Sequence, residues 1–180
     1  MTNPPRSATE ELLISTAADR AIASTVLTNF AHHKVFLDGS YYESYDAKYV
    51  LGALRDALSR SGALLVNTET NSEFVVEARS GALSIDNSDA LFGIPSAGAP
   101  LPLAGALAIP EIALYKASHQ RSIAKLALLA YATHSREHYY SSGPMVGKSY
   151  NNYYKVLLGI IQWTTTDIPE KKRPKKQKND

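Results

Sequence analysis

Residues 112–131, IALYKASHQRSIAKLALLAY, decide the fold, because this stretch can form either a helix or a strand buried on both faces. Its many Ala and Leu residues favour a helix. The apolar residues in both alternating sets from Ile123 to Leu129 favour a strand that is covered on both sides. We predict a long strand here, which turns at residues 134–137 into a second strand over residues 138–149.

Two helices are predicted before this hairpin. Ser7 and Glu10 form a capping-box pattern that begins a helix extending to about Phe30. Over Tyr45–Ser61 the apolar residues recur three and four positions apart, which predicts a second amphipathic helix. Gly62 follows at the position where a helix commonly ends.

Short strands separate and follow these helices. Runs of β-branched and aromatic residues predict strands at residues 34–40, 63–68 and 73–86, the last with one face toward solvent. The remainder of the chain, which is rich in tyrosine and apolar residues from Tyr150 to Leu158, predicts one more edge element before Pro169 ends the domain. The chain therefore alternates helix and strand first and then continues in long hairpins.

This order of elements predicts an α+β fold. We expect a two-layer sandwich in which the two main helices pack on one face of a mixed, largely antiparallel sheet with long hairpin strands. Residues 7–170 have the length that one hydrophobic core supports, so we expect a single α+β domain. Residues 1–6 are expected to form an N-terminal tether, and residues 171–180 a disordered basic tail.

Charge and cysteine content exclude several classes of function. Residues 171–180 hold six of the 19 basic residues and one of the 17 acidic residues, which leaves 13 basic and 16 acidic residues in the body. The body is therefore not a basic nucleic-acid binder by charge, and we expect no specific nucleic-acid partner. The absence of cysteine excludes a disulfide framework or a cysteine nucleophile within this chain. No nucleotide-binding or serine-hydrolase signature is present, so we expect no cofactor.

A long apolar segment supplies the candidate interface. Residues 90–110, ALFGIPSAGAPLPLAGALAIP, carry no charge, and their four prolines predict an apolar loop rather than a membrane-spanning helix. We expect Leu91, Phe92 and Ile109 to anchor the loop in the core, and the tip at residues 96–105 to face a partner. The candidate interface residues are Leu91, Phe92, Ile94, Leu101, Leu103, Leu107, Tyr153 and Tyr154.

His134, Glu137 and His138 spell H-x-x-E-H, the signature of the inverted zincins. In a helix, the two histidines would bind zinc and Glu137 would act as the general base. We expect these residues at a polar hairpin tip, without a third ligand. The sequence therefore predicts neither a metal site nor a catalytic residue here.

Lys116, His119 and Arg121 offer a second alternative site. Three groups that carry or can gain positive charge, placed close together, could bind an anion. The same residues suit the outward face of an exposed strand equally well. We favour this second interpretation.

Eight runs of sequence, in order, resemble a family of uncharacterised bacterial outer-membrane lipoproteins: NPPRSATEELLISTAADRAI, KVFLD, YVLGALRDALSRSGALLV, VVEARSGALSID, LFGIP, PEIALYK, RSIAKLALLAY and SSGP. The resemblance covers about residues 4–170. It implies a mature domain that follows a signal peptide and a lipidated cysteine at the periplasmic face of the outer membrane. The order of elements is similar, more loosely, to envelope-assembly lipoproteins of the curli-secretion type, which is a likeness of fold.

Together these observations predict a non-enzymatic periplasmic module that binds an envelope protein or associates with itself. The alternative is a membrane-contacting or ring-forming envelope protein that uses residues 90–110. A metal-dependent hydrolase built on H-x-x-E-H is the third hypothesis. The resemblance implies outer-membrane anchoring through a lipid outside this sequence, whereas a native start at Met1 would imply a cytoplasmic protein.

Overall fold

The computed structural model describes residues 6–95, 97–101, 105–109 and 111–169, and for residues 97–101 and 105–109 the description is confined to the backbone. Three of its strands contain 19 or more residues. The elements are α1 (Ala8–Ala23), η1 (Thr28–Phe30), β1 (Lys34–Asp38), α2 (Ala47–Arg60), β2 (Leu64–Leu65), η2 (Glu69–Asn71), β3 (Phe74–Ile94), β4 (Ala97–Leu101), β5 (Gly105–Ile109), β6 (Ile112–Ala132), β7 (His138–Val156), η3 (Leu157–Gly159) and β8 (Ile161–Thr166).

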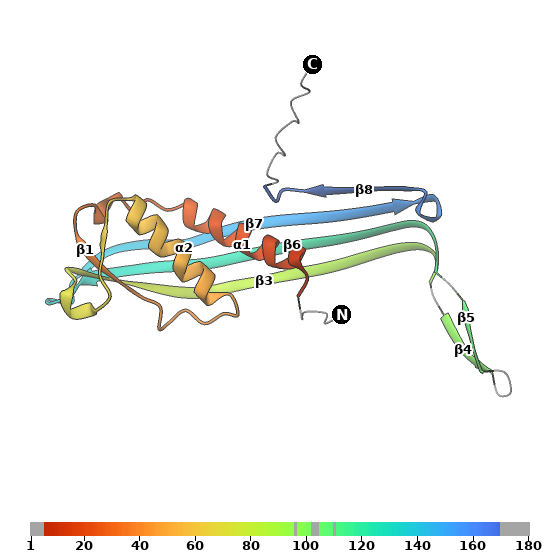
Figure 1. The fold of residues 1–180 in the computed structure, drawn as a ribbon, viewed down its shortest axis with the longest axis horizontal. Helices are drawn as coiled ribbons and strands as arrows, with labels where there is room; N and C mark the ends of the chain where they lie inside the picture. Colours follow the sequence, from red (N-terminus) through yellow and green to blue (C-terminus); the bar gives the residue numbers. More distant parts are fainter. Residues whose placement is uncertain (1–5, 96, 102–104, 110, 170–180) are drawn as a thin grey trace, which may run out of the picture.

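Six strands form one mixed sheet in the order β2-β1-β3-β6-β7-β8. β1 pairs in parallel with β2 and β3, and the remaining neighbours pair antiparallel. Figure 1 shows both helices over the half of the long strands near β1, while the other half extends beyond them. The structure confirms the predicted α+β fold, with two helices on one face of a largely antiparallel sheet.

Helix α1 begins at the capping box that the sequence predicts. The Ser7 hydroxyl accepts a hydrogen bond from the Glu10 N–H, and the Glu10 carboxylate accepts one from the Ser7 N–H (2.8 Å). This pair satisfies N–H groups that a helix N-terminus leaves without partners. The helix ends at Ala23 instead of near Phe30, because a separate 3-10 turn over Thr28–Phe30 carries the chain toward β1.

Small residues let α1 lie directly on the sheet. Its backbone at Ala17 and Ala21 lies against Gly147 of β7, where an added Cβ would collide with the Ala17 carbonyl oxygen. Nearby, the Ser149 hydroxyl of β7 donates a hydrogen bond to the Leu13 carbonyl oxygen (2.6 Å). The covered half of the sheet is therefore held at close packing distance from α1.

The core lies between the helices and this half of the sheet. Leu54 and Leu58 from α2 are fully buried, and so are Leu126 and Leu128 from β6. Alternate residues of β6 from Ala124 to Ala130 thus face the helices. Because side chains alternate along a strand, the odd-numbered residues of β6 face the opposite side, which the helices do not cover.

The long strands continue past the limits that the sequence predicts. β3 reaches Ile94 instead of ending at Asp86, and β7 reaches Val156 instead of ending near Ser149. Pairing with β6, with Ile94 opposite Ile112 and Val156 opposite Tyr115, provides the hydrogen bonds of both extensions, with one register shift between Phe92 and Gly93. Among the described residues, no helix combines the length and the apolar character needed to cross a membrane.

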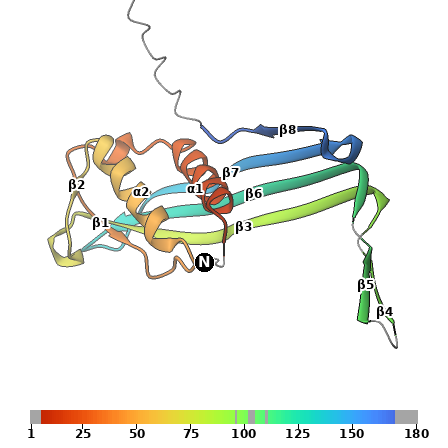
Figure 2. The same cartoon turned by 45° about the vertical axis from the view of Figure 1, so that its right-hand side comes forward.

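Residues 90–110 are in large part strand, which corrects the prediction of a loop. Residues 90–94 belong to β3, and β4 and β5 pair antiparallel as a two-stranded extension at the far end of the long strands (Figure 2). Antiparallel pairing between these two segments supplies backbone partners that local sequence does not reveal. Residues 1–5 of the predicted tether, Leu103 and the predicted tail at residues 171–180 lie outside the described residues.

Candidate functional site

Exposed apolar side chains gather at the far end of the long strands. Of the 20 large apolar side chains exposed in the described residues, 11 lie there: Leu91, Phe92, Ile94, Ile112, Leu114, Tyr115, Leu157, Leu158, Ile160, Ile161 and Trp163. We call residues 91–94, 112–115 and 157–163 the apolar end. Monomeric soluble proteins rarely expose large contiguous apolar patches, so this surface is the candidate functional site.

Register places some of these residues in rows across the sheet. One row contains Phe92, Tyr115, Val156 and Ile161, and the next contains Ala90, Ala117, Tyr154 and Trp163. Directly opposed residues of antiparallel strands share a face. Both rows include odd-numbered residues of β6, so they lie on the face that the helices leave uncovered. We call this side of the sheet the uncovered face.

Aromatic contacts order the second row. The rings of Tyr154 and Trp163 stack with their centroids 5.1 Å apart and their planes at 16°. The His119 ring meets the Tyr154 ring edge-on at 5.6 Å. Such contacts between neighbouring strands hold the side chains in place before any partner binds.

The connection between β7 and β8 adds leucines in an unusual conformation. Leu157 and Leu158 both have positive φ angles, 49° and 58°, a region that glycine and asparagine adopt far more readily. Both side chains are exposed. This conformation is costly for leucine, so the exposed turn is a strained segment of the apolar end.

The sequence-predicted interface residues divide between the two faces. Phe92 and Tyr154 lie on the uncovered face, in adjacent rows. Leu91 and Tyr153 lie on the helix side of the sheet, where the Tyr153 hydroxyl donates to the Gln162 side chain. Ile94 is exposed at the end of β3. The backbones of Leu101 and Leu107 belong to β4 and β5, and Leu103 lies outside the described residues.

One expectation about this segment is wrong. Leu91 and Phe92 do not anchor it in the core, because Phe92 is 68% exposed and Leu91 is 38% exposed. The core is confined to the half of the sheet beneath the helices, and these residues lie beyond that half. The side chain of Ile109 lies outside the description.

Sequence reasoning missed Tyr115, Ile161 and Trp163. Their membership in the rows depends on the register between β6, β7 and β8. The single tryptophan beside three threonines, in a short stretch rich in β-forming residues, was the signal that β8 exists. The local sequence does not show which side chains of β8 lie on the same face of the sheet as a given residue of β7.

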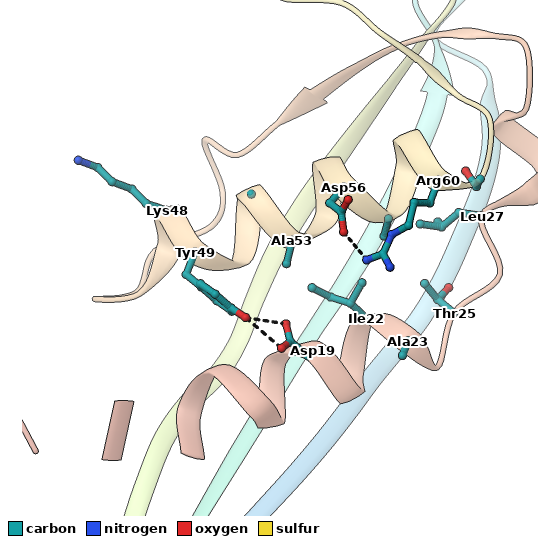
Figure 3. A pocket seen from close by; sticks show the side chains of 13 residues that line it. Asp19, Ile22, Ala23, Thr25, Leu27, Lys48, Tyr49, Ala53, Asp56 and Arg60 are labelled. Carbon is teal, nitrogen blue, oxygen red and sulfur yellow. Dashed lines mark hydrogen bonds and ion pairs between the residues drawn. The ribbon is translucent and has the colours of Figure 1, made fainter. Parts of the chain in front are cut away.

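A groove of about 950 Å³ between α1 and α2 is an alternative site (Figure 3). The Tyr49 hydroxyl donates to the Asp19 carboxylate (2.9 Å), and burial, reinforced by Asp19, raises the pKa of Tyr49. Arg60 pairs with Asp56 within α2. These polar groups thus satisfy one another along the helix contact, so the groove is a weaker candidate than the apolar end.

The H-x-x-E-H residues lie at the hairpin between β6 and β7. His134 and Glu137 are exposed beside the turn, and His138 begins β7. The inverted zincin site needs a helix that presents both histidines on one side, whereas here the chain reverses direction between them. In the parts of the chain that the structure describes, no three His, Asp or Glu side chains are grouped to hold a metal ion.

Strand alternation separates the three residues of the anion-site alternative. Lys116 lies on the helix side and pairs with Glu111 (2.9 Å). His119 and Arg121 lie on the uncovered face. The three groups therefore do not form one site.

The sequence matches the model of a family of unknown function, DUF6655, over residues 1–164. No curated protein matches the chain. The matched range contains both helices and most of the sheet, including the apolar end.

Proposed function

The chain belongs to the family of unknown function DUF6655, and we propose that it is a non-enzymatic binding or assembly module of the bacterial cell envelope, with the apolar end as its contact surface. One observation carries this proposal. The core already lies beneath the helices, and a second group of large apolar side chains stands apart from it in solvent. Covering such a surface is favourable by about 25 cal/mol per Å² of apolar area, so a partner gains by binding it.

The compartment is part of the proposal. Resemblance to outer-membrane lipoproteins supports a periplasmic domain anchored through a lipidated cysteine outside this sequence. The partner is then an envelope protein or a second copy of the chain. Oriented anchoring would hold the apolar end in a fixed relation to the membrane.

A second candidate is a membrane-contacting or ring-forming envelope protein. Ring formation is favoured by the position of β8 at one edge of the six-stranded sheet. An edge strand presents unpaired N–H and C=O groups to which another chain can add. Membrane contact is favoured by the aromatic rows described above.

Site-specific photocrosslinking in the native bacterium tests the proposed function. A photoreactive amino acid replaces Phe92 in one variant and Val26 in the control, because the two side chains are almost equally exposed, 68% and 65%. Val26 lies between α1 and η1. Its carbonyl oxygen accepts a hydrogen bond from Tyr140, which stands opposite Ala130 at the end of the long strands away from the apolar end. We expect crosslinks to envelope components from position 92 and few from position 26.

Equal crosslinking from both positions, or none from position 92, would contradict the proposal. Cell fractionation of the same cultures checks the compartment independently. The chain is expected with the envelope fraction, and full recovery from the cytoplasmic fraction would exclude an envelope role.

A further inference from the structure

A band of cations lies on the uncovered face, on the reverse side of the part of the sheet against which α1 packs. Arg79 on β3, Arg121 and Lys125 on β6 and Lys148 on β7 all have exposed side chains. Register and alternation place them on the same face as Tyr154 and Trp163. We call these four residues the basic band.

The basic band is not neutralised by ion pairs. Within the described residues, the ion pairs found join other groups. The acidic residues of the long strands on this face are Glu77 and Asp86, and Asp86 stands opposite Arg121. The face therefore keeps a positive balance, although the folded body as a whole has more acidic than basic residues.

The side chains change character in a fixed order along the strands. From Arg121 the strand β6 leads to Ala117 in the row of Tyr154 and Trp163, and then to Tyr115 in the row of Phe92. At about 3.3 Å per residue, Arg121 lies roughly 13 Å from the aromatic row and roughly 20 Å from the last row. Lys148, Lys125 and Arg79 stand at β6 positions 123, 125 and 127, so they lie roughly 20, 26 and 33 Å from the aromatic row. The order is basic, then aromatic, then apolar.

We propose that the uncovered face docks on an anionic phospholipid bilayer, with the apolar end at the acyl-chain boundary and the basic band facing lipid phosphates. This inference rests on the proposed function, whose second candidate is membrane contact, and it names the lipid that the same contact surface would bind. Tyrosine and tryptophan concentrate at the headgroup level of membranes, and anionic lipids attract nearby lysine and arginine. The apolar, aromatic and basic parts of the face would therefore contact the acyl chains, the headgroup region and the lipid phosphates, respectively.

The Arg121 region also has room for a headgroup. A cavity of about 480 Å³ opens beside Arg121 and Lys148, and Tyr150, Asn152 and Asp167 contribute to its wall. The Asp167 carboxylate is paired with Arg20 of α1. Arginine and lysine side chains are long enough to cover part of the distance to phosphates at the level of the aromatic row. Their attraction acts over about 8 Å at physiological ionic strength.

Other occupants fit these observations less well. A second copy that bound face to face would set one basic band against another. A nucleic acid would match the basic band and the stacked aromatic rings. Nucleic acid would offer no apolar surface to Leu157, Leu158 and Ile160, which are exposed and of which Ile160 is 80% exposed.

Vesicle binding by the full chain tests the proposal, and Trp163 is the probe because it is the only tryptophan. The vesicles contain phosphatidylcholine alone or phosphatidylcholine with phosphatidylglycerol. We expect the emission of Trp163 to shift to shorter wavelength only with the anionic vesicles. Flotation of the protein with these vesicles should decrease as salt is added.

Two charge-matched variants locate the effect. Arg121→Gln with Lys148→Gln removes two cations from the basic band, and Lys48→Gln with Arg60→Gln removes two exposed cations from α2. We expect the first variant to bind anionic vesicles roughly 30-fold more weakly and the second to bind almost as the unaltered chain does. Thermal melts followed by circular dichroism confirm that both variants fold.

Several outcomes would overturn the lipid assignment. Equal binding to both kinds of vesicle, or equally weakened binding by both variants, would show that the basic band does not bind anionic lipid. Binding to a single-stranded oligonucleotide but not to anionic vesicles would assign the band to nucleic acid. Self-association that shifts Trp163 emission without any vesicle binding would identify a second copy as the partner, and the proposed function would stand. Loss of vesicle binding together with absent crosslinks at position 92 would reject both proposals.

Discussion

Gly147 sets how closely α1 can approach the sheet, since its missing side chain leaves room for the carbonyl oxygen of Ala17. We predict that Gly147→Ala lowers the free energy of unfolding by about 1–3 kcal/mol, because the added Cβ forces α1 away from β7. Urea denaturation measures the change.

Gly52→Ala is the matched control for this substitution. Gly52 lies within α2, and an added Cβ there meets no atom within 4 Å. Alanine at this position should raise the free energy of unfolding by up to about 1 kcal/mol, because it lowers the entropy lost on helix formation. A Gly147→Ala variant as stable as the unaltered chain would mean that α1 does not pack on β7 as described.

The stability of helix α1 depends on pH through the ionisation of Glu10. Hydrogen bonding of its carboxylate by the Ser7 N–H, and then by the Ser7 hydroxyl, lowers the pKa of Glu10 from its ordinary value of 4.5. A lowered folded-state pKa stabilises the fold above pH 4.5, and that contribution is lost as the pH falls through the folded-state value. Protonation in this acidic range should therefore release the first turn of α1.

Nuclear magnetic resonance titration of the Glu10 carboxyl tests this prediction. The variant Ser7→Pro removes both the N–H and the hydroxyl, so the pKa of Glu10 should return toward 4.5. If the titration midpoint of the Glu10 carboxyl is the same in Ser7→Pro as in the unaltered chain, the capping box is not the cause of the lowered pKa.

At the scale of elements, Asp167, the residue after β8, connects that end of the strand to α1 through an ion pair with Arg20. Its carboxylate accepts hydrogen bonds from the Arg20 guanidinium and from the Tyr150 N–H (2.7 Å), and Arg20 also donates to the Asp167 carbonyl oxygen (2.7 Å). We predict that Asp167→Ala loosens β8, so that its backbone amides exchange hydrogen about fivefold faster or more, since such a bond contributes about 1 kcal/mol. Amides of β3 and β6 in the helix-covered half should keep their rates.

Hydrogen exchange read by mass spectrometry distinguishes these regions. Asp56→Ala provides the control, because the Asp56–Arg60 pair is exposed and contributes about 0.5 kcal/mol or less. Unchanged exchange in β8 of Asp167→Ala would contradict the role assigned to this carboxylate.

Sequence predicted elements best where the whole signal lies within one stretch of the chain. The amphipathic repeat of α2, the capping box of α1 and the hairpin turn near His134 each appear in the structure. The extension of β3 through residues 87–94 was missed, because it depends on pairing with β6, from Asn87 opposite Gln120, 33 residues away, to Ile94 opposite Ile112, 18 residues away. The local sequence pattern contains little information about such long-range pairing.

The candidate site was predicted only in part for the same reason. Phe92 and Ile94 could be selected because they lie in a charge-free segment. Trp163 and Lys148 could not, because their neighbours on the uncovered face come from other strands through cross-strand register. A surface assembled from four strands has no signature within any one of them.

At the scale of the whole molecule, one half of the sheet holds the fold together and the other half presents a surface (Figure 1). We predict that Phe92→Asp leaves the melting temperature nearly unchanged, because Phe92 is mostly exposed. Leu126→Asp should prevent folding, because it buries an unpaired charge in a site that is 1% exposed. Melts followed by circular dichroism compare the two, and a Phe92→Asp chain that fails to fold would place the apolar end within the core.

The central proposal is that the apolar end is free in the isolated chain and covered in the cell envelope, and acrylamide quenching of Trp163 fluorescence tests it most directly. The account predicts strong quenching of the purified protein and protection when envelope membranes of the native bacterium are added. Phe92→Asp should reduce that protection, because the two residues lie in adjacent rows of the same face. Quenching of Trp163 that is equally strong with and without the envelope membranes would contradict the proposal.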